Sequence, residues 1–298
     1  MRKSLVLRAI AILITGALGA CTASTVSGPS AATGAMSTAQ SDSVGEVLTL
    51  EASSLVDGSS FNNAQANAAL LPSAGGPSFS IAATSSCSPA ISPTPVVDTD
   101  GDIVPDSIRV DFTGCSVAFP LVTVALAGTI DVVDPTPTTA DLNARLDFTN
   151  FTRSETLNST GKTRTAVRNG VRTRSGDSNS LQHSETAFQT VYTFRDGSTA
   201  THVRTWSAAF TADTPGSIKA DSLPNGNWNI TGTSTWTRGS NTWDFSVTTN
   251  PQLHYNATCS VAPRFDSGTM TVVVTRGTLT STVTIQFTAC GQYTVTRS

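Results

Sequence analysis

Residues 226–250 alternate between two kinds of side chain with a period of two, the spacing of a β-strand and not of a helix. Gly239-Ser240 divides the stretch in its middle, and such a dipeptide between two alternating runs predicts a tight hairpin turn. A two-residue turn at this position sets the register of the hairpin. The expected cross-strand pairs are Trp236 with Trp243, Ser234 with Phe245, and Gly232 with Val247.

Threonine replaces charge on the polar side of this hairpin and throughout the chain. Serine and threonine make up 85 of 298 residues, whereas charged residues are 13%, about half the ~25% of a typical soluble domain. Threonine is β-branched and suits half-exposed strands. The alternation continues from Phe79 onward, with two further turns predicted at Asn169-Gly170 and Asp196-Gly197. We expect an all-β fold, with roughly eleven to thirteen strands in a large antiparallel meander wrapped into a sandwich or partly closed barrel.

The first twenty residues have the three parts of an export signal. Arg2 and Lys3 supply the positive start, and 9–20 form an apolar run of about 12 residues, below the roughly 17–25 that span a bilayer. Leu18-Gly19-Ala20-Cys21 resembles the lipobox of bacterial lipoproteins, in which the cysteine is acylated and becomes the first residue. The resemblance implies lipidation of Cys21, with palmitate among its acyl chains, and anchoring in the cell envelope. Thr22 in place of aspartate favours the outer membrane.

Four segments follow from these patterns. Residues 1–20 are the expected signal peptide, and 21–42 are a lipidated tether rich in small polar residues. Residues 43–76 contain a short helical segment and a linker, because a capping box at Ser43 precedes apolar residues spaced for a helix near 44–56. A single β domain is expected over 77–298.

Composition and motifs argue against two classes of function. Without Arg2, Lys3 and Arg8 the chain has 15 basic residues against 21 acidic ones, which disfavours nucleic acid as a partner. The sequence contains no G-x-S-x-G nucleophile motif and no glycine-rich phosphate loop after a strand. Glu155 and Glu185 are the only plausible pair of catalytic glutamates, so we expect a protein that is not an enzyme. Three histidines lack metal-ligand spacing: His183, His202 and His254.

Four cysteines follow Cys21, and an even number in an exported chain suggests disulfides. Three connectivities are possible. Two blocks of sequence look like diverged copies, each with a Cys-Ser followed about thirty residues later by a strand that ends in Thr-Gly-Cys or Thr-Ala-Cys. This likeness favours the pairs Cys87–Cys115 and Cys259–Cys290. A strict three-strand meander would hold the paired cysteines about 9–10 Å apart, so the intervening segment must bend.

Residues 98–106 read Asp-Thr-Asp-Gly-Asp-Ile-Val-Pro-Asp, the most specific motif of the domain. Carboxylates at alternate positions of a tight loop can converge on one hard cation such as Ca²⁺. The run resembles the aspartate-rich calcium repeats of the thrombospondin type-3 kind. That resemblance implies side-chain ligands at Asp98, Asp100, Asp102 and Asp106, with a carbonyl from Val104. The alternative is an acidic loop exposed to solvent.

Two other groups of residues have both a functional and a structural interpretation. Five basic residues surround Asn169-Gly170 and predict a projecting hairpin, either for contact with anionic lipid or polymers or to protect a sheet edge. They are Lys162, Arg164, Arg168, Arg172 and Arg174. Four tryptophans can line a sugar or lipid site, or simply form core: Trp206, Trp228, Trp236 and Trp243.

The chain also resembles threonine-rich lipoproteins of environmental bacteria that carry an aspartate loop between paired cysteines, a likeness that implies no activity. The leading hypothesis is a non-enzymatic envelope lipoprotein, structural or adhesive, stabilised by calcium and disulfides. One alternative is a carrier that holds a lipid or another hydrophobic ligand inside a curved sheet. A weaker one is an enzyme that acts on polysaccharides. The membrane is the expected partner through the anchor, with an envelope component or a hydrophobic ligand as the second.

Overall fold

The fold is described from a computed structural model that covers 48, 52, 84–85, 89–102, 104–119, 121–219, 222–259 and 263–298. The chain divides into two units, Met1–Ala32 and Thr33–Ser298, and every described residue belongs to the second. The predicted signal peptide, the acylation site at Cys21 and the tether lie outside the described residues. Only Leu48 and Ala52 represent the helix predicted near 44–56, and both are helical.

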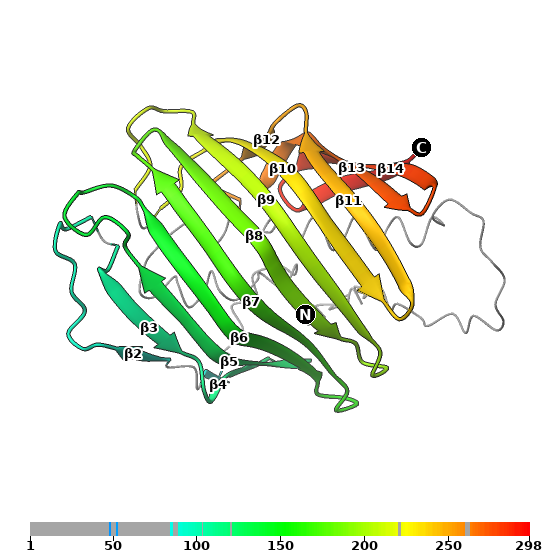
Figure 1. The fold of residues 1–298 in the computed structure, drawn as a ribbon, viewed down its shortest axis with the longest axis horizontal. Helices are drawn as coiled ribbons and strands as arrows, with labels where there is room; N and C mark the ends of the chain where they lie inside the picture. The colour runs from blue at the N-terminus through cyan, green and yellow to red at the C-terminus, as the bar shows by residue number, and fades with distance from the viewer. Residues whose placement is uncertain are drawn as a thin grey trace, which may run out of the picture. The chain divides into compact units, whose positions relative to one another are not determined.

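The described strands form one antiparallel sheet of 15 strands, in which consecutive strands are mostly neighbours (Figure 1). This confirms the predicted all-β antiparallel meander. The order runs β1-β4-β5-β6-β7-β8-β9-β10-β11-β13-β14-β15, with β3 also paired to β5, β2 paired to β3, and β12 paired to β10 and β13. The strands are β1 (Thr84–Ser85), β2 (Ala90–Ser92), β3 (Ser107–Asp111), β4 (Cys115–Ala118), β5 (Val122–Val133), β6 (Ala144–Leu157), β7 (Thr163–Gly176), β8 (Ser180–Thr193), β9 (Thr199–Ala212), β10 (Gly226–Arg238), β11 (Asn241–Thr249), β12 (Leu253–Tyr255), β13 (Phe265–Arg276), β14 (Leu279–Ala289) and β15 (Gln292–Arg297).

The hairpin predicted over 226–250 is confirmed, including its register. Strands β10 and β11 are joined at Gly239-Ser240 and pair Trp236 with Trp243, Ser234 with Phe245, and Gly232 with Val247. The alternation along β10 separates a buried face from an exposed one, because Trp228 and Ile230 are fully buried while Thr231 is exposed. Asp196-Gly197 likewise lies in the turn between β8 and β9, as predicted.

The prediction of a hairpin turn at Asn169-Gly170 is wrong. Both residues lie inside β7, where the register with β8 shifts between Asn169 and Val171. A side chain at Gly170 would bring its Cβ to 3.1 Å from the Cα of Phe188, so the glycine allows the two strands and the phenylalanine ring to approach closely. Asn-Gly suits a bulge as well as a turn, since both accept positive φ, and here Gly170 has a φ of 134°.

Bulges at one level of the sheet continue from β5 to β9. The register also shifts between β5 and β6, between β6 and β7, and between β8 and β9. Two amides that this irregularity takes out of regular pairing are bonded by side chains: Asn150 N donates to Asn169 Oδ1 at 2.7 Å, and Ala187 N donates to Thr205 Oγ1 at 3.1 Å. Bulges bend strands and increase their twist, so this level is where the long strands curve.

One face of the sheet is buried and carries two apolar clusters. The first lies mainly on β8 to β15 and includes Trp206, Trp228 and the helical residues Leu48 and Ala52; the second lies on β3 to β8. Trp236 and Trp243 are partly buried and pack against the first cluster. The tryptophans are therefore part of the core, in which each fully buried large side chain contributes on the order of 1.5–3 kcal/mol to folding.

Cys259 and Cys290 form a disulfide with their Cα atoms 5.6 Å apart. Cys259 lies in the loop after β12 and Cys290 lies between β14 and β15. The predicted pairing of Cys259 with Cys290 is confirmed. Cys115 is also disulfide-bonded. The predicted partner Cys87 is outside the described residues, so that pairing stays a prediction.

Candidate metal centre

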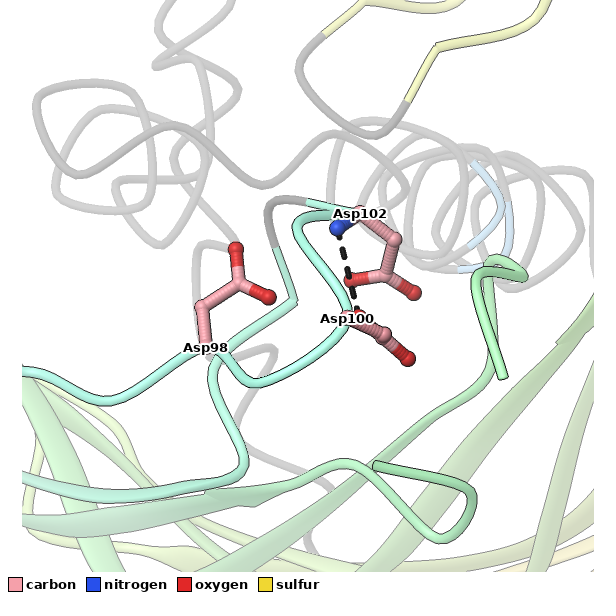
Figure 2. A group of neighbouring side chains, drawn as sticks. All are labelled: Asp98, Asp100 and Asp102. Carbon is pink, nitrogen blue, oxygen red and sulfur yellow. Dashed lines mark hydrogen bonds between the residues drawn. The ribbon is translucent and has the colours of Figure 1, made fainter. Parts of the chain in front are cut away.

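The aspartate loop lies between β2 and β3 and is built from turns that the aspartates themselves stabilise. Asp98 Oδ1 accepts a hydrogen bond from Gly101 N at 2.8 Å, and Asp102 Oδ1 accepts one from Val104 N at 2.7 Å. Asp102 N donates to Asp100 Oδ1 at 3.3 Å, as the dashed line in Figure 2 shows. Short polar side chains that bond amides two or three residues on favour such tight turns.

These turns bring three carboxylates together. Asp98, Asp100 and Asp102 each offer an oxygen, and these oxygens lie within 4.8 Å of one another (Figure 2). Two ligands on opposite sides of one Ca²⁺ are about 5 Å apart, since each bond is 2.3–2.6 Å long. The second oxygens of Asp100 and Asp102 are buried and have no hydrogen-bond partner in the part of the chain described. A cation would satisfy both oxygens, and the set of donors suits a hard divalent ion.

The electrostatics of the loop also favour a cation. Burial raises the pKa of Asp102, and repulsion from Asp100, Asp134 and Asp98 adds to this effect, while the hydrogen bond from Val104 N opposes it. The negative charge of Asp102 acts on Arg174. Burial lowers the pKa of Arg174 to about 10, against the opposing charge of Asp102.

The other two predicted ligands have different surroundings. Both oxygens of Asp106 accept hydrogen bonds from Thr99, one from its amide at 2.8 Å and one from its hydroxyl at 2.6 Å. These bonds lower the pKa of Asp106 and close the base of the loop. Val104 is fully buried in the second apolar cluster and anchors the loop to the core. Metal binding by Asp106 and by the Val104 carbonyl stays a prediction.

One residue near the loop was missed in the sequence. Asp134 follows β5, where its amide donates to Asp106 O at 3.1 Å. Asp134 is 3% exposed, and its Oδ2 is buried without a hydrogen-bond partner among the described residues. Asp134 is 28 positions beyond Asp106, so only the pairing of β3 with β5 brings the two together.

The two glutamates considered as a catalytic pair are both held by arginines. Glu185 is 1% exposed and accepts hydrogen bonds from Arg172 and Arg204 on the neighbouring strands. Burial raises its pKa, but the charges and hydrogen bonds of the two arginines outweigh burial and lower it to about 2. Glu155 is paired with Arg153 at 2.9 Å and Arg164 at 2.5 Å. Burial opposes ionisation there too, but the arginines lower its pKa.

The predicted basic surface hairpin does not form. Arg172 and Arg174 are 4% and 3% exposed on the inner face of the sheet, because the strand continues through Asn169-Gly170 and alternate residues of β7 point inward. Arg164 is half-exposed and paired with Glu155, while Lys162 is exposed before β7. Arg168 has intermediate exposure. The five basic residues therefore do not form one exposed surface that could contact an anion.

His254 forms a second polar group that spacing did not predict. Its Nδ1 lies 2.7 Å from Asp266 Oδ1, and its Nε2 lies 2.9 Å from Asp213 Oδ2. The two carboxylates contact opposite edges of the ring, so they do not converge on one point. Burial opposes the charged ring, but hydrogen bonds to Asp213 and Asp266 raise the pKa of His254. This group links the end of β9 to β12 and β13.

Comparisons with protein-family models, with curated proteins and with solved structures found no match. Among the described residues, no helix is long and apolar enough to cross a membrane. The interpretation of the site therefore depends on the chemistry of its own residues.

Proposed function

We propose that the protein is a non-enzymatic lipoprotein of the bacterial cell envelope, attached through Cys21, with a structural or adhesive role. Calcium at the aspartate loop and disulfides stabilise its sheet. The observation that carries the proposal is the group of Asp98, Asp100 and Asp102, which offer oxygens within 4.8 Å of one another and in which Asp100 and Asp102 each have a buried oxygen without a hydrogen-bond partner among the described residues. The disulfide Cys259–Cys290 supports an oxidising compartment outside the cytoplasm.

The state of the two glutamates supports a role without catalysis. A glycosidase needs one carboxyl group that is protonated near neutral pH, which requires a raised pKa. Arginines instead lower the pKa of both Glu155 and Glu185. Both carboxylates therefore act as ionised partners inside the sheet.

Attachment and calcium are tested separately. The full chain, expressed in a bacterial host with its leader, should fractionate with membranes, and Cys21→Ser should release it. Intact mass after detergent extraction should show the added acyl chains on the wild type only. Cys21→Ser protein that stays in the membrane fraction would contradict attachment through Cys21. For calcium, the melting temperature of the full chain should rise on adding CaCl₂ and fall again with chelator; an unchanged melting temperature would count against the site.

A carrier of a hydrophobic ligand is a second candidate, favoured by polar atoms on the buried face of the sheet. Both ring nitrogens of His183 and the indole nitrogens of Trp206 and Trp228 are buried without hydrogen-bond partners in the part of the chain described. The ring of His183 lies 5.3 Å from that of Trp228. Each unsatisfied buried group costs about 1–3 kcal/mol. An amphipathic ligand with one polar group would satisfy several of them at once.

Native mass spectrometry of gently extracted protein tests the carrier. A bound hydrophobic molecule of constant mass, released by Trp228→Phe, would support it. The control is Trp243→Phe, at a partly buried position on the neighbouring strand. Protein that carries no additional mass, and whose tryptophan fluorescence does not change when a long-chain fatty acid is added, would exclude the carrier.

A further inference from the structure

The calcium proposal has three carboxylates on one loop, and a loop alone holds an ion weakly unless the rest of the protein fixes it. Asp134 comes from a different part of the chain and lies beside this loop. Strand β3 pairs with β5 so that Ser107 faces Val133, and Asp134 then bonds Asp106 through its amide. The end of β5 therefore lies beside the end of the aspartate loop.

The two carboxylate oxygens of Asp134 have different surroundings. Its Oδ1 accepts a hydrogen bond from Thr136 N at 2.7 Å. Its Oδ2 is buried and has no hydrogen-bond partner among the described residues, although the residue is 97% buried. A carboxylate oxygen that is removed from water and unpaired is costly, so native proteins pair such groups with donors or metals.

The charge around the loop is unbalanced. The negative charges of Asp100, Asp134 and Asp98 all act on Asp102, and the charge of Asp102 in turn acts on Arg174. A divalent cation bound among these carboxylates would offset their repulsion.

We propose that Asp134 is a further ligand of the cation held by Asp98, Asp100 and Asp102, so that the bound ion ties the aspartate loop to the end of β5. This inference rests on the proposed calcium site. It gives the ion a mechanical role, because the loop before β3 and the segment after β5 are then held together by metal bonds in addition to backbone pairing.

Calcium titration of the chelator-treated full chain tests the inference, with MgCl₂ as a parallel probe. Asp134→Asn keeps the shape of the side chain and removes its charge. We expect it to weaken Ca²⁺ binding about tenfold or more. Asp141→Asn is the matched control, because Asp141 lies in the same connection and bonds Thr136 and Asn143 but does not act on Asp102. The control should bind Ca²⁺ like the wild type.

The outcomes separate this inference from the proposal beneath it. Wild-type affinity in Asp134→Asn, with binding lost in Asp100→Asn, would overturn the role of Asp134 and leave the calcium site standing. A wild type that binds no Ca²⁺ at millimolar concentration would overturn both. If Asp134→Asn does not fold, hydrogen exchange of the wild type decides. Calcium should slow exchange in 98–106 and in 134–143 together, and slower exchange in 98–106 alone would contradict the inference.

Discussion

Glu185 and the aspartate loop hold carboxylates in the same sheet under opposite conditions. Glu185 lies in the middle of the buried face, and its two oxygens accept hydrogen bonds from Arg172 and Arg204. Asp100, Asp102 and Asp134 lie near the β3–β5 end, and each has a buried oxygen without a hydrogen-bond partner among the described residues. Both oxygens of the glutamate are hydrogen-bonded within the protein, whereas each aspartate has one buried oxygen for which the described residues supply no hydrogen bond.

The difference predicts how stability should respond when an acid is substituted in each group. Two arginines stabilise the ionised form of Glu185, so removing the glutamate takes a buried ion-pair partner from each of them. Burial raises the pKa of Asp102, and repulsion from Asp100, Asp134 and Asp98 adds to this effect, so removing one of these charges relieves repulsion in the absence of a cation. Substitutions at the two places should therefore change stability in opposite directions until calcium is added.

The largest effect is expected from Glu185→Ala. It should lower the free energy of unfolding by about 3–5 kcal/mol, because Arg172 and Arg204 both lose the buried carboxylate that they bind. Urea denaturation of the full chain measures the loss. Asp147→Ala is the control, since Asp147 pairs with Arg145 on the exposed face and should cost less than about 1 kcal/mol. Equal losses in the two variants would show that the buried ion pairs of Glu185 contribute no more to stability than a surface ion pair does.

The dependence of stability on pH should also differ between Glu185 and Asp102. The pKa of Glu185 is lowered from 4.5 to about 2, so its contribution is fully present above pH 4.5 and is lost as the pH falls toward 2. This amounts to about 3 kcal/mol over that window. The pKa of Asp102 is raised, so its protonation on acidification stabilises the metal-free fold. The unfolding free energies of wild type and Glu185→Gln should converge as the pH falls, and a constant difference would contradict this assignment.

Asp100→Asn should reverse its sign with calcium. In chelator the variant should be as stable as the wild type or slightly more stable, because one repulsive charge is gone. With Ca²⁺ at about 100 times its dissociation constant the wild type should gain about 2.7 kcal/mol, and the variant should lose most of this gain. Asp196→Asn, in the turn between β8 and β9, is the control and should respond like the wild type. If Asp100→Asn is less stable than the wild type in chelator, Asp100 stabilises the metal-free fold, as Glu185 does.

The smallest effect on stability is expected at His254, whose ring is hydrogen-bonded to both Asp213 and Asp266. Its raised pKa means that the stabilisation is fully present below pH 6.5 and is lost as the pH rises through the folded pKa. Because the group is partly exposed, His254→Gln should cost less than about 1 kcal/mol. Denaturation at about pH 5.5 and about pH 8.5 should show a larger loss at the lower pH. An equal loss at both values would show that hydrogen bonding alone, and not charge, links Asp213 and Asp266.

Local patterns in the sequence predicted local structure well. The β10–β11 hairpin was predicted with its register because period-two alternation and a two-residue turn together leave one pairing. The aspartate loop was predicted because its turns are made by the residues of the motif. Asn169-Gly170 was misassigned because the dipeptide suits a turn and a bulge equally, and the choice depends on Phe188 in the next strand.

The sequence by itself predicted the all-β class, the β10–β11 hairpin and the presence of an acidic loop, and it favoured the disulfide between Cys259 and Cys290. These features depend on residues close together or on repeated patterns. Only the tertiary structure decided that Arg172 and Arg204 meet Glu185, and that Asp134 lies beside the aspartate loop. Such meetings depend on the register between long strands, and each bulge shifts that register by a residue. Contacts between distant strands are therefore not recorded in any local pattern of the sequence.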